Sequence, residues 1–232
     1  MRKAVFWDFD GTAVLSERVW GKAMILALHD VMEDAGVTAE DIYEKRPKNG
    51  YPWDKPRVDY LHLLGPGLWW NSLTAHFEQT YLACGVKPDA ARMAAVRVRE
   101  HMLDPKMYHE YPGVRDALTA AAALGYQNYI LSNNYPELPK VMEAMGLANY
   151  FDGIFTSGAI GYEKPRPEIF HYALKAAGDP GLAVMVGDNP VADIEGGKAA
   201  GMTAVLIHCK KPSKADFTLD GFEGLIEILK SL

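Results

Sequence analysis

The sequence has very little cysteine, since Cys84 and Cys209 are the only two among 232 residues. They lie far apart and neither belongs to a second pair of metal-binding side chains. This spacing excludes a disulfide framework and gives no support for a zinc site. A protein with so few thiols does not depend on an oxidising environment for its stability. We therefore expect it in the cytoplasm.

The sequence also lacks an excess of positive charge and any long apolar run. It carries 24 lysines and arginines against 30 aspartates and glutamates, which gives a formal net charge of -6. This balance removes the broad attraction that proteins use to bind a nucleic acid polymer or a membrane surface. Polar residues soon interrupt the apolar stretches at residues 24–28 and 68–70, so neither is long enough to cross a bilayer. We expect no nucleic acid polymer and no membrane among its partners.

Short apolar runs alternate with helical patterns through much of the chain. Runs that are too short for a typical helix predict strands at residues 3–9, 127–131, 154–155, 183–186 and 203–207. Helical patterns lie between them at residues 113–124, 137–145, 167–177 and 191–200. The alternation predicts an α/β fold with a mostly parallel sheet that helices cover on both faces. Ligands of such folds bind beyond the carboxyl ends of the strands.

One long region interrupts this alternation, because residues 16–104 contain helical patterns and no convincing strand. Ser16 is suited to cap a first helix, in which apolar residues recur at helical spacing. Further helices are expected at residues 57–64, 68–83 and 89–102. The sequence therefore predicts two units. Residues 1–15 and 105–232 form one unit, here called the core, and residues 16–104 form an inserted helical unit, here called the cap.

Acidic residues follow two of the predicted strands. Asp8 and Asp10 lie two residues apart at the end of the first strand, so their side chains project to the same side. Carboxylates this close repel each other and favour a cation or a shared proton. Asp188 and Asp193 follow a second strand, and Mg²⁺ prefers such oxygen ligands. The alternative is local: Asp10 caps a turn, and Asp188 or Asp193 caps the following helix.

Three more polar residues stand where predicted loops begin or end. Ser132 and Asn133 follow the strand at residues 127–131, where a hydroxyl and backbone N–H groups can bind phosphate oxygens. Serine and asparagine are also common turn formers. Lys164 precedes a predicted helix, and a fixed lysine there could neutralise a phosphate. For that residue taken alone, a solvated lysine in a proline-rich turn is the competing interpretation.

Taken in order, these pieces resemble the four motifs of the haloacid dehalogenase (HAD) superfamily. Residues 8–12 resemble the first motif, Ser132 the second, Lys164 with Pro165 the third, and residues 187–193 the fourth. Residues 111–114 also resemble the return of the chain from that family's cap into its core. The resemblance implies a Rossmann-like core with a helical cap inserted between the first two motifs. It further implies a phosphatase that acts through an aspartyl-phosphate intermediate on a small phosphorylated metabolite.

The resemblance also assigns catalytic roles. It makes Asp8 the nucleophile, Asp10 the general acid and base, and Lys164 the group that neutralises charge. Ser132 and Asn133, together with Lys164, become the phosphate-binding residues.

The metal implied by the resemblance is Mg²⁺. Its ligands would be the Asp8 carboxylate, the Asp10 backbone carbonyl and Asp188, with Asp193 acting directly or through water and the lysine. The charge of the ion and of Lys164 would allow an anionic nucleophile to approach an anionic phosphate.

Other functions stay open on this scaffold. A phosphomutase of the β-phosphoglucomutase type shares both aspartates of the first motif and returns the phosphoryl group to a sugar. A binding protein could use the same scaffold without catalysis. A dehalogenase is disfavoured, because the members of the family that break carbon–halogen bonds lack the aspartate that corresponds to Asp10.

The cap contains one loop with an unusual composition, at residues 46–57. Arg46, Lys48, Lys55 and Arg57 alternate there with Tyr51 and Trp53. The loop could recognise the part of the substrate beyond the phosphate, or it could be a solvated cationic loop with anchoring aromatic rings. The physiological substrate and the oligomeric state are not determined by the sequence.

Overall fold

A six-stranded parallel sheet forms the centre of the core in this computed structural model, which describes residues 1–15, 18–33 and 35–232. The spatial order of the strands is β5-β4-β1-β6-β7-β8, and every neighbouring pair is parallel. The strands are β1 (Lys3–Trp7), β4 (Tyr126–Ser132), β5 (Gly153–Thr156), β6 (Leu182–Gly187), β7 (Thr203–Ile207) and β8 (Phe217–Leu219). The predicted α/β fold is confirmed.

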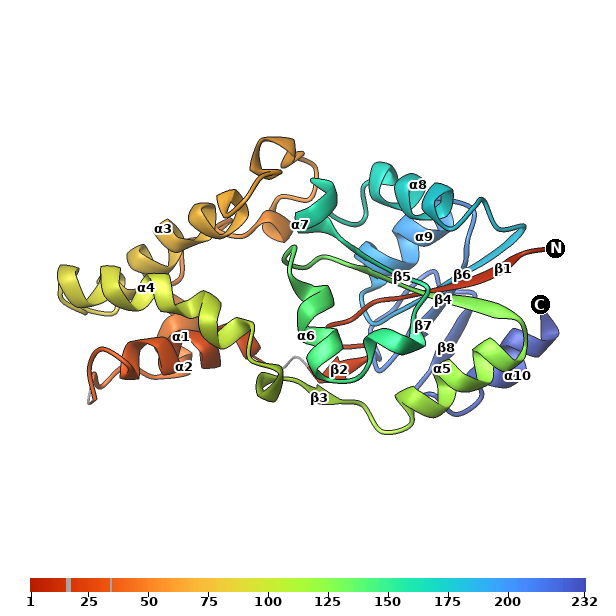
Figure 1. The fold of residues 1–232 in the computed structure, drawn as a ribbon, viewed down its shortest axis with the longest axis horizontal. Coiled ribbons are helices and arrows are strands. Elements are labelled where there is room, and N and C mark those ends of the chain that lie inside the picture. The colour runs from red at the N-terminus through yellow and green to blue at the C-terminus, as the bar shows by residue number, and fades with distance from the viewer. Residues whose placement is uncertain (16–17, 34) are drawn as a thin grey trace.

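Alternation along β1 explains why helices cover both faces of the sheet. Val5 and Trp7 belong to one apolar cluster and Ala4 and Phe6 to another, because successive side chains of a strand point to opposite faces. All four side chains are fully buried. In Figure 1, α5 (Val114–Ala123) and α10 (Leu225–Ser231) lie on one side of the sheet, and α8 (Pro167–Ala176) and α9 (Gly196–Ala199) on the other.

Several short elements connect the strands and the longer helices. The short helices of the core are α6 (Leu138–Ala144), α7 (Ser157–Ile160), the 3₁₀ turns η3 (Pro105–Met107) and η4 (Ala148–Tyr150), and η5 (Pro190–Glu195), which is one turn of π-helix. A separate two-stranded ribbon pairs β2 (Val14–Leu15) antiparallel with β3 (His109–Glu110). Neither this ribbon nor β8 was predicted, because runs of two or three residues carry no periodicity to recognise.

Helices make up the region between β2 and β3. They are α1 (Val19–His29), α2 (Ala39–Lys45), α3 (Leu68–Ala83) and α4 (Pro88–Met102), with the 3₁₀ turns η1 (Pro52–Asp54) and η2 (Leu61–Leu63) between α2 and α3. Figure 1 shows the four longer helices together at one end of the sheet. The cap residue predicted at Ser16 lies outside the described residues. The division of the chain into core and cap stays a prediction.

The helix predicted at residues 57–64 is wrong, since the structure has only the η2 turn there. The reason is a long-range contact: the backbone N–H of Tyr60 donates to the carbonyl of Gly161 in the core at 2.7 Å, and not to a helical neighbour. Helix α2 was missed by the sequence reasoning. It begins with a capping box in which the Thr38 hydroxyl accepts from the backbone N–H of Asp41, a signal that the sequence does contain.

Polar contacts hold the helices of the cap against the core. The Trp70 indole N–H and the Arg99 guanidinium both donate to the carboxylate of Glu137, just before α6, at 2.8 and 2.7 Å. On the other side, the Arg166 guanidinium donates to the backbone carbonyl of Arg57 at 2.8 Å. These bonds tie α3, α4 and the segment between η1 and η2 to the core.

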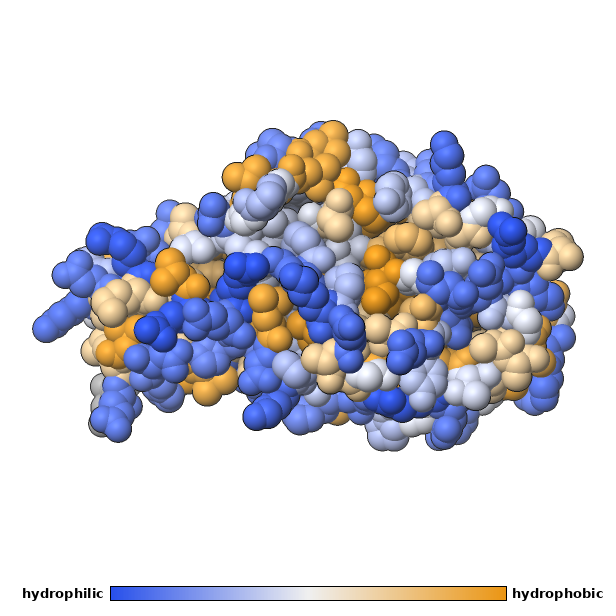
Figure 2. Space-filling model, viewed as in Figure 1, coloured by the Kyte–Doolittle hydropathy of each residue, from blue (hydrophilic) through white to orange (hydrophobic). Residues whose placement is uncertain are grey.

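The surface is mixed, with one apolar cluster close to the junction of cap and core. Figure 2 shows hydrophobic residues gathered at the top of this face, over the segment that leads into α3. Leu61, Leu64 and Leu68 lie in this segment, each exposed over more than two-fifths of its surface. Among the described residues, no helix combines the length and the apolar character that crossing a bilayer requires.

Candidate active site

Asp8 follows β1 directly, and a tight turn brings its neighbours over the same strand end. The carbonyl of Phe9 accepts hydrogen bonds from the N–H groups of Ala13 and Val14 at 2.9 and 3.0 Å. Gly11 has φ +80, which L side chains rarely adopt, and a Cβ on it would lie 2.6 Å from Asp188 Oδ2. Glycine is therefore required where this turn passes the second acidic cluster.

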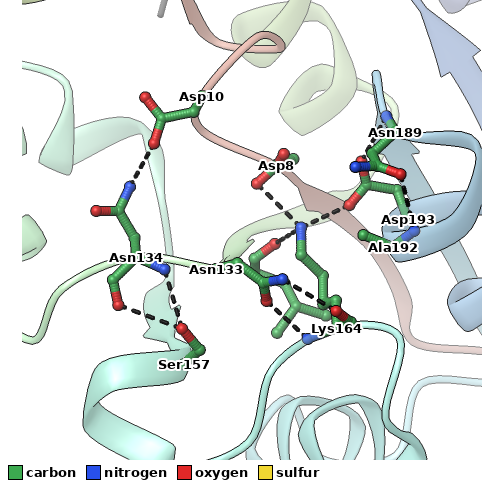
Figure 3. A network of polar contacts seen from close by, with 10 residues as sticks. Asp8, Asp10, Asn133, Asn134, Ser157, Lys164, Asn189, Ala192 and Asp193 are labelled. Carbon is green, nitrogen blue, oxygen red and sulfur yellow. Dashed lines mark hydrogen bonds and ion pairs between the residues drawn. The ribbon is translucent and has the colours of Figure 1, made fainter. Parts of the chain in front are cut away.

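Lys164 lies at the centre of the polar network shown in Figure 3. Its ammonium group contacts Asp193 Oδ1 at 2.5 Å, the carbonyl of Leu131 at 2.7 Å and Asp8 Oδ1 at 2.9 Å. The side chain is only 1% exposed. Burial lowers the pKa of a lysine, yet the carboxylates of Asp193 and Asp8 outweigh burial and hold the pKa of Lys164 above its ordinary value. The lysine is a permanently charged group in this network.

Asn133 holds the lysine segment in place. Its side-chain oxygen accepts from the backbone N–H of Lys164 at 2.7 Å, and its side-chain nitrogen donates to the carbonyl of Lys164 at 3.0 Å. The sequence predicts that Asn133 binds phosphate, and this stays a prediction beside the positioning contact that its side chain makes. For that predicted contact with phosphate, Asn133 can still donate through the second hydrogen of its side-chain amide and through its backbone N–H.

Asp193 is completely buried beneath the loop that follows β6. One carboxylate oxygen contacts Lys164, and the other accepts from the backbone N–H of Asn189 at 2.9 Å. Asn189 in turn accepts from Val191 and Ala192 at 3.0 Å and so caps η5. The cap of this turn is therefore Asn189, and not Asp188 or Asp193 as the structural alternative supposed.

Asp10 points away from the lysine, toward the loop after β4 (Figure 3). Its carboxylate accepts from the Asn134 side chain at 2.7 Å, while its other oxygen, Oδ1, is buried without a hydrogen-bond partner. Burial, reinforced by the negative charge of Asp8, raises the pKa of Asp10 to about 7. The Ser132 hydroxyl is also buried without a hydrogen-bond partner. Both groups have hydrogen-bonding capacity left for a ligand.

Three carboxylates form a cluster that could hold a metal ion. Oxygen atoms of Asp8, Asp188 and Asp193 all lie within 4.8 Å of one another. Burial and the negative charge of Asp8 raise the pKa of Asp188, so a nearby cation would stabilise the charged form of this carboxyl. An all-oxygen donor set of this charge fits Mg²⁺. The carboxylate of Asp10 stands outside the cluster, which leaves its backbone carbonyl for the predicted metal contact.

A cavity of about 260 Å³ opens above these groups. Its core side contains all but one of the predicted site residues, namely Asp8, Asp10, Ser132, Asn133, Lys164 and Asp188, and Asp193 lies directly behind Lys164. The cap contributes Val19, Trp20 and Trp53. The structure thus brings every predicted residue to one place.

Two residues near the site carried no role in the sequence reasoning. Asn134, which orients Asp10, belongs to the polar run after β4 that the sequence singles out, but its side chain had been given no role of its own. Glu163 is 1% exposed, and burial raises the pKa of its carboxyl to about 7 although Ser157 and Lys164 oppose the rise. No local signal marks Glu163, because a glutamate beside a lysine in a proline-rich segment is ordinarily solvated.

Residues 2–201 match the sequence profile of a hydrolase family described as haloacid dehalogenase-like. The chain belongs to this family. The family resemblance that the motifs predicted is therefore confirmed, and the protein is a HAD-like hydrolase.

Several relatives resemble this hydrolase over most of its length. Haloacid dehalogenase-like hydrolase domain-containing protein 3 of Mus musculus is 32% identical over 211 residues, covering 89% of this chain and 82% of the relative. Proteins of the same name from Bos taurus, Homo sapiens and Xenopus laevis match over 61%, 60% and 62% of their own length. A glyceraldehyde 3-phosphate phosphatase of Pyrococcus furiosus is 26% identical, with 98% of this chain and 93% of the relative covered.

A solved structure extends the likeness to the whole fold of this hydrolase. The HAD phosphatase from Thermococcus onnurineus superimposes with a TM-score of 0.66 at 24% identity, covering 98% of this chain and 97% of the other. At this identity the likeness concerns the fold alone.

Proposed function

We propose that this hydrolase is a Mg²⁺-dependent phosphatase that cleaves small phosphate monoesters through an aspartyl-phosphate on Asp8. The observation that carries the proposal is the position of Lys164, whose ammonium group lies 2.9 Å from Asp8 and 2.5 Å from Asp193 at the floor of the cavity. This arrangement supplies a buried carboxylate nucleophile and a fixed positive charge at the same point. The phosphatase named among the relatives supports the same reaction class.

In the first step, a carboxylate oxygen of Asp8 attacks phosphorus and the bond to the ester oxygen breaks. Lys164 offsets the negative charge on the phosphoryl oxygens, and the free hydroxyl of Ser132 donates a hydrogen bond to one of them. Asp10 donates its proton to the departing alkoxide, so that a neutral alcohol leaves. Its raised pKa, about 7, supports a protonated form at neutral pH.

In the second step, water attacks phosphorus of the aspartyl-phosphate. Asp10, now a carboxylate, accepts a proton from this water, and the bond between phosphorus and the Asp8 oxygen breaks. Inorganic phosphate leaves and Asp8 is restored. The Asn134 side chain donates to the Asp10 carboxylate and so orients this acid and base at the wall of the cavity.

Mg²⁺ would be held by the carboxylates of Asp8 and Asp188 and the backbone carbonyl of Asp10. Bound there, it would supply positive charge that offsets the repulsion between the aspartate and the phosphate. Both oxygens of Asp193 already accept hydrogen bonds from the protein, which supports its contact with the ion through water and through Lys164. Asp193 also keeps the ammonium group aimed at Asp8.

The setting that we propose is a reducing one. Cys84 and Cys209 are both free thiols, which supports a cytoplasmic enzyme acting on soluble phosphorylated metabolites.

The test is phosphate release from p-nitrophenyl phosphate and from a panel of sugar and polyol phosphates, with Mg²⁺ and in metal-free buffer. We expect turnover only with the metal. We expect Asp8→Asn to abolish it, and Asp116→Asn, a matched change of an exposed carboxylate on α5, to leave it unchanged. An isomerised sugar phosphate without free phosphate would support a phosphomutase. The proposal is wrong if no compound releases phosphate in a metal-dependent way, or if Asp8→Asn keeps full activity.

A further inference from the structure

The cavity above the catalytic groups has an uneven distribution of charge. Of the described residues that line it, Lys164 is the single cation, and three others, Asp8, Asp10 and Asp188, carry carboxyl groups. Every contact that the Lys164 ammonium makes is with the floor of the site. Once a phosphate has been bound through this lysine and the metal, the other described residues that line the cavity offer no positive charge to a second anionic group.

Arg46 and Arg18 of the cap, which do not line the cavity, contact other groups. The Arg46 guanidinium lies over the rings of Tyr43 and Tyr51, 4.9 and 5.6 Å from their centroids. Arg18 pairs with Glu40 at 2.5 Å. Lys55 lines a neighbouring cavity. The loop at residues 46–57 therefore reaches the active site through an aromatic ring, and not through its cations.

That ring belongs to a fixed aromatic wall. Trp53 stacks on Tyr51 with ring centroids 4.8 Å apart and an interplanar angle of 12°. Trp20 packs against both, at 5.4 and 5.5 Å, and against Phe77 behind them at 6.1 Å. Such packing leaves the indoles little freedom to rearrange around a charged ligand. Together with Val19, they present mainly apolar surface to whatever is attached to the phosphate.

We infer that the preferred substrates are phosphate monoesters of small neutral alcohols, such as polyols or hydroxyaldehydes, whose carbon skeleton lies against Trp20 and Trp53. This inference rests on the proposed phosphatase function and specifies its substrate class. A carboxylate or second phosphate on the leaving group would lie against aromatic rings and beside aspartates, and no cation would pair with it there. Binding it there costs free energy, because its lost hydration is not replaced.

A pair of substrates that differ at one carbon tests the inference on the wild-type enzyme. Glycerol 3-phosphate and 3-phosphoglycerate share a three-carbon skeleton, but the second has a carboxylate where the first has a hydroxymethyl group. We expect kcat/KM to be at least about 30-fold higher for glycerol 3-phosphate, the factor expected when one charge is buried unpaired. Equal values, or a preference for 3-phosphoglycerate, would overturn the inference.

A cation placed in the aromatic wall should reverse part of this preference. Trp53→Arg adds a guanidinium at the cap side of the cavity, and Trp53→Gln is the matched control that removes the indole without adding charge. We expect the arginine variant alone to narrow the ratio between the two substrates about 10-fold, by raising kcat/KM for 3-phosphoglycerate. If both variants change the ratio of the two kcat/KM values equally, the preference does not depend on the charge of the leaving group.

The two proposals can fail separately. If no compound of the panel, glycerol 3-phosphate and p-nitrophenyl phosphate included, releases phosphate with Mg²⁺ present, the phosphatase function fails and the substrate class fails with it. If phosphate is released but the carboxylate is tolerated, only the substrate class is wrong. The wild-type comparison decides this even if a Trp53 variant does not fold.

Discussion

The buried carboxyl of Glu163 should make the stability of the protein depend on pH. Burial raises its pKa from 4.5 to about 7 in the folded state, while in the unfolded chain the group returns to its ordinary value. Between these values the folded protein binds more protons than the unfolded chain. The free energy of unfolding that Glu163 contributes is therefore full at acidic pH and is lost as the pH rises from about 4.5 to about 7.

The size of the effect follows from the same pKa change. One pH unit of difference is worth about 1.4 kcal/mol, so the loss attributable to Glu163 is at most about 3 kcal/mol. Replacing Glu163 by glutamine keeps the shape of the side chain and removes its titration. The wild-type curve of unfolding free energy against pH should then fall more steeply than that of Glu163→Gln, by up to about 3 kcal/mol over this window.

Denaturation by urea at a series of pH values from 4.5 to 8, in metal-free buffer, measures both curves. Other carboxyl groups also titrate in this range, but they are common to both proteins and cancel in the difference. Glu143→Gln, an exposed change on α6, provides the control and should parallel the wild type. If the Glu163→Gln curve also parallels the wild type within about 0.5 kcal/mol, the carboxyl does not titrate as its burial requires.

Three further predictions concern the polar network and the cap. Lys164→Met leaves two buried carboxylates unpaired, so without metal the free energy of unfolding should fall by about 3–5 kcal/mol. The control, Lys175→Met on the surface of α8, should lower the free energy of unfolding by less than about 0.5 kcal/mol. A small loss for Lys164→Met by urea denaturation would contradict this pairing. Mg²⁺ at about 100 times its Kd should add about 3 kcal/mol to wild-type stability, and an equal gain in Asp188→Asn would speak against that ligand. Glu137→Ala removes both bonds to the cap and should lower the free energy of unfolding by about 1–2 kcal/mol in the same measurement. An unchanged free energy of unfolding would show that these bonds do not stabilise the protein.

Five of the six strands of the sheet, and the residues of the candidate site, could be predicted from the sequence because both depend on local runs. Each central strand is a short apolar run, and polar residues placed directly after such runs must meet at one edge of a parallel sheet. This is why Asp8, Ser132 and Asp188 could be expected in one place although more than fifty residues separate each from the next.

Other features depend on partners that are distant in the sequence and carry no local pattern. The turn at Leu61–Leu63 replaces a predicted helix because the amide of Tyr60 binds a carbonyl in the core. The direction of Arg46 is set by two rings of the cap, so the composition of its loop could not show that Trp53, and not a cation, lines the cavity. In both cases the contacts of the folded chain, and not the local sequence, determine the conformation.

The ribbon of β2 and β3 has a mechanical consequence. The two segments that connect the helical region to the sheet run side by side and are bonded to each other, so both chain connections of that region pass through one ribbon. The backbone N–H of Gly11 donates to the carbonyl of Val14 at the start of this ribbon, at 2.8 Å. The turn that carries Asp10 is thus bonded directly to the ribbon from which the helical region departs, and a substitution that disturbs the ribbon should also displace the proton donor.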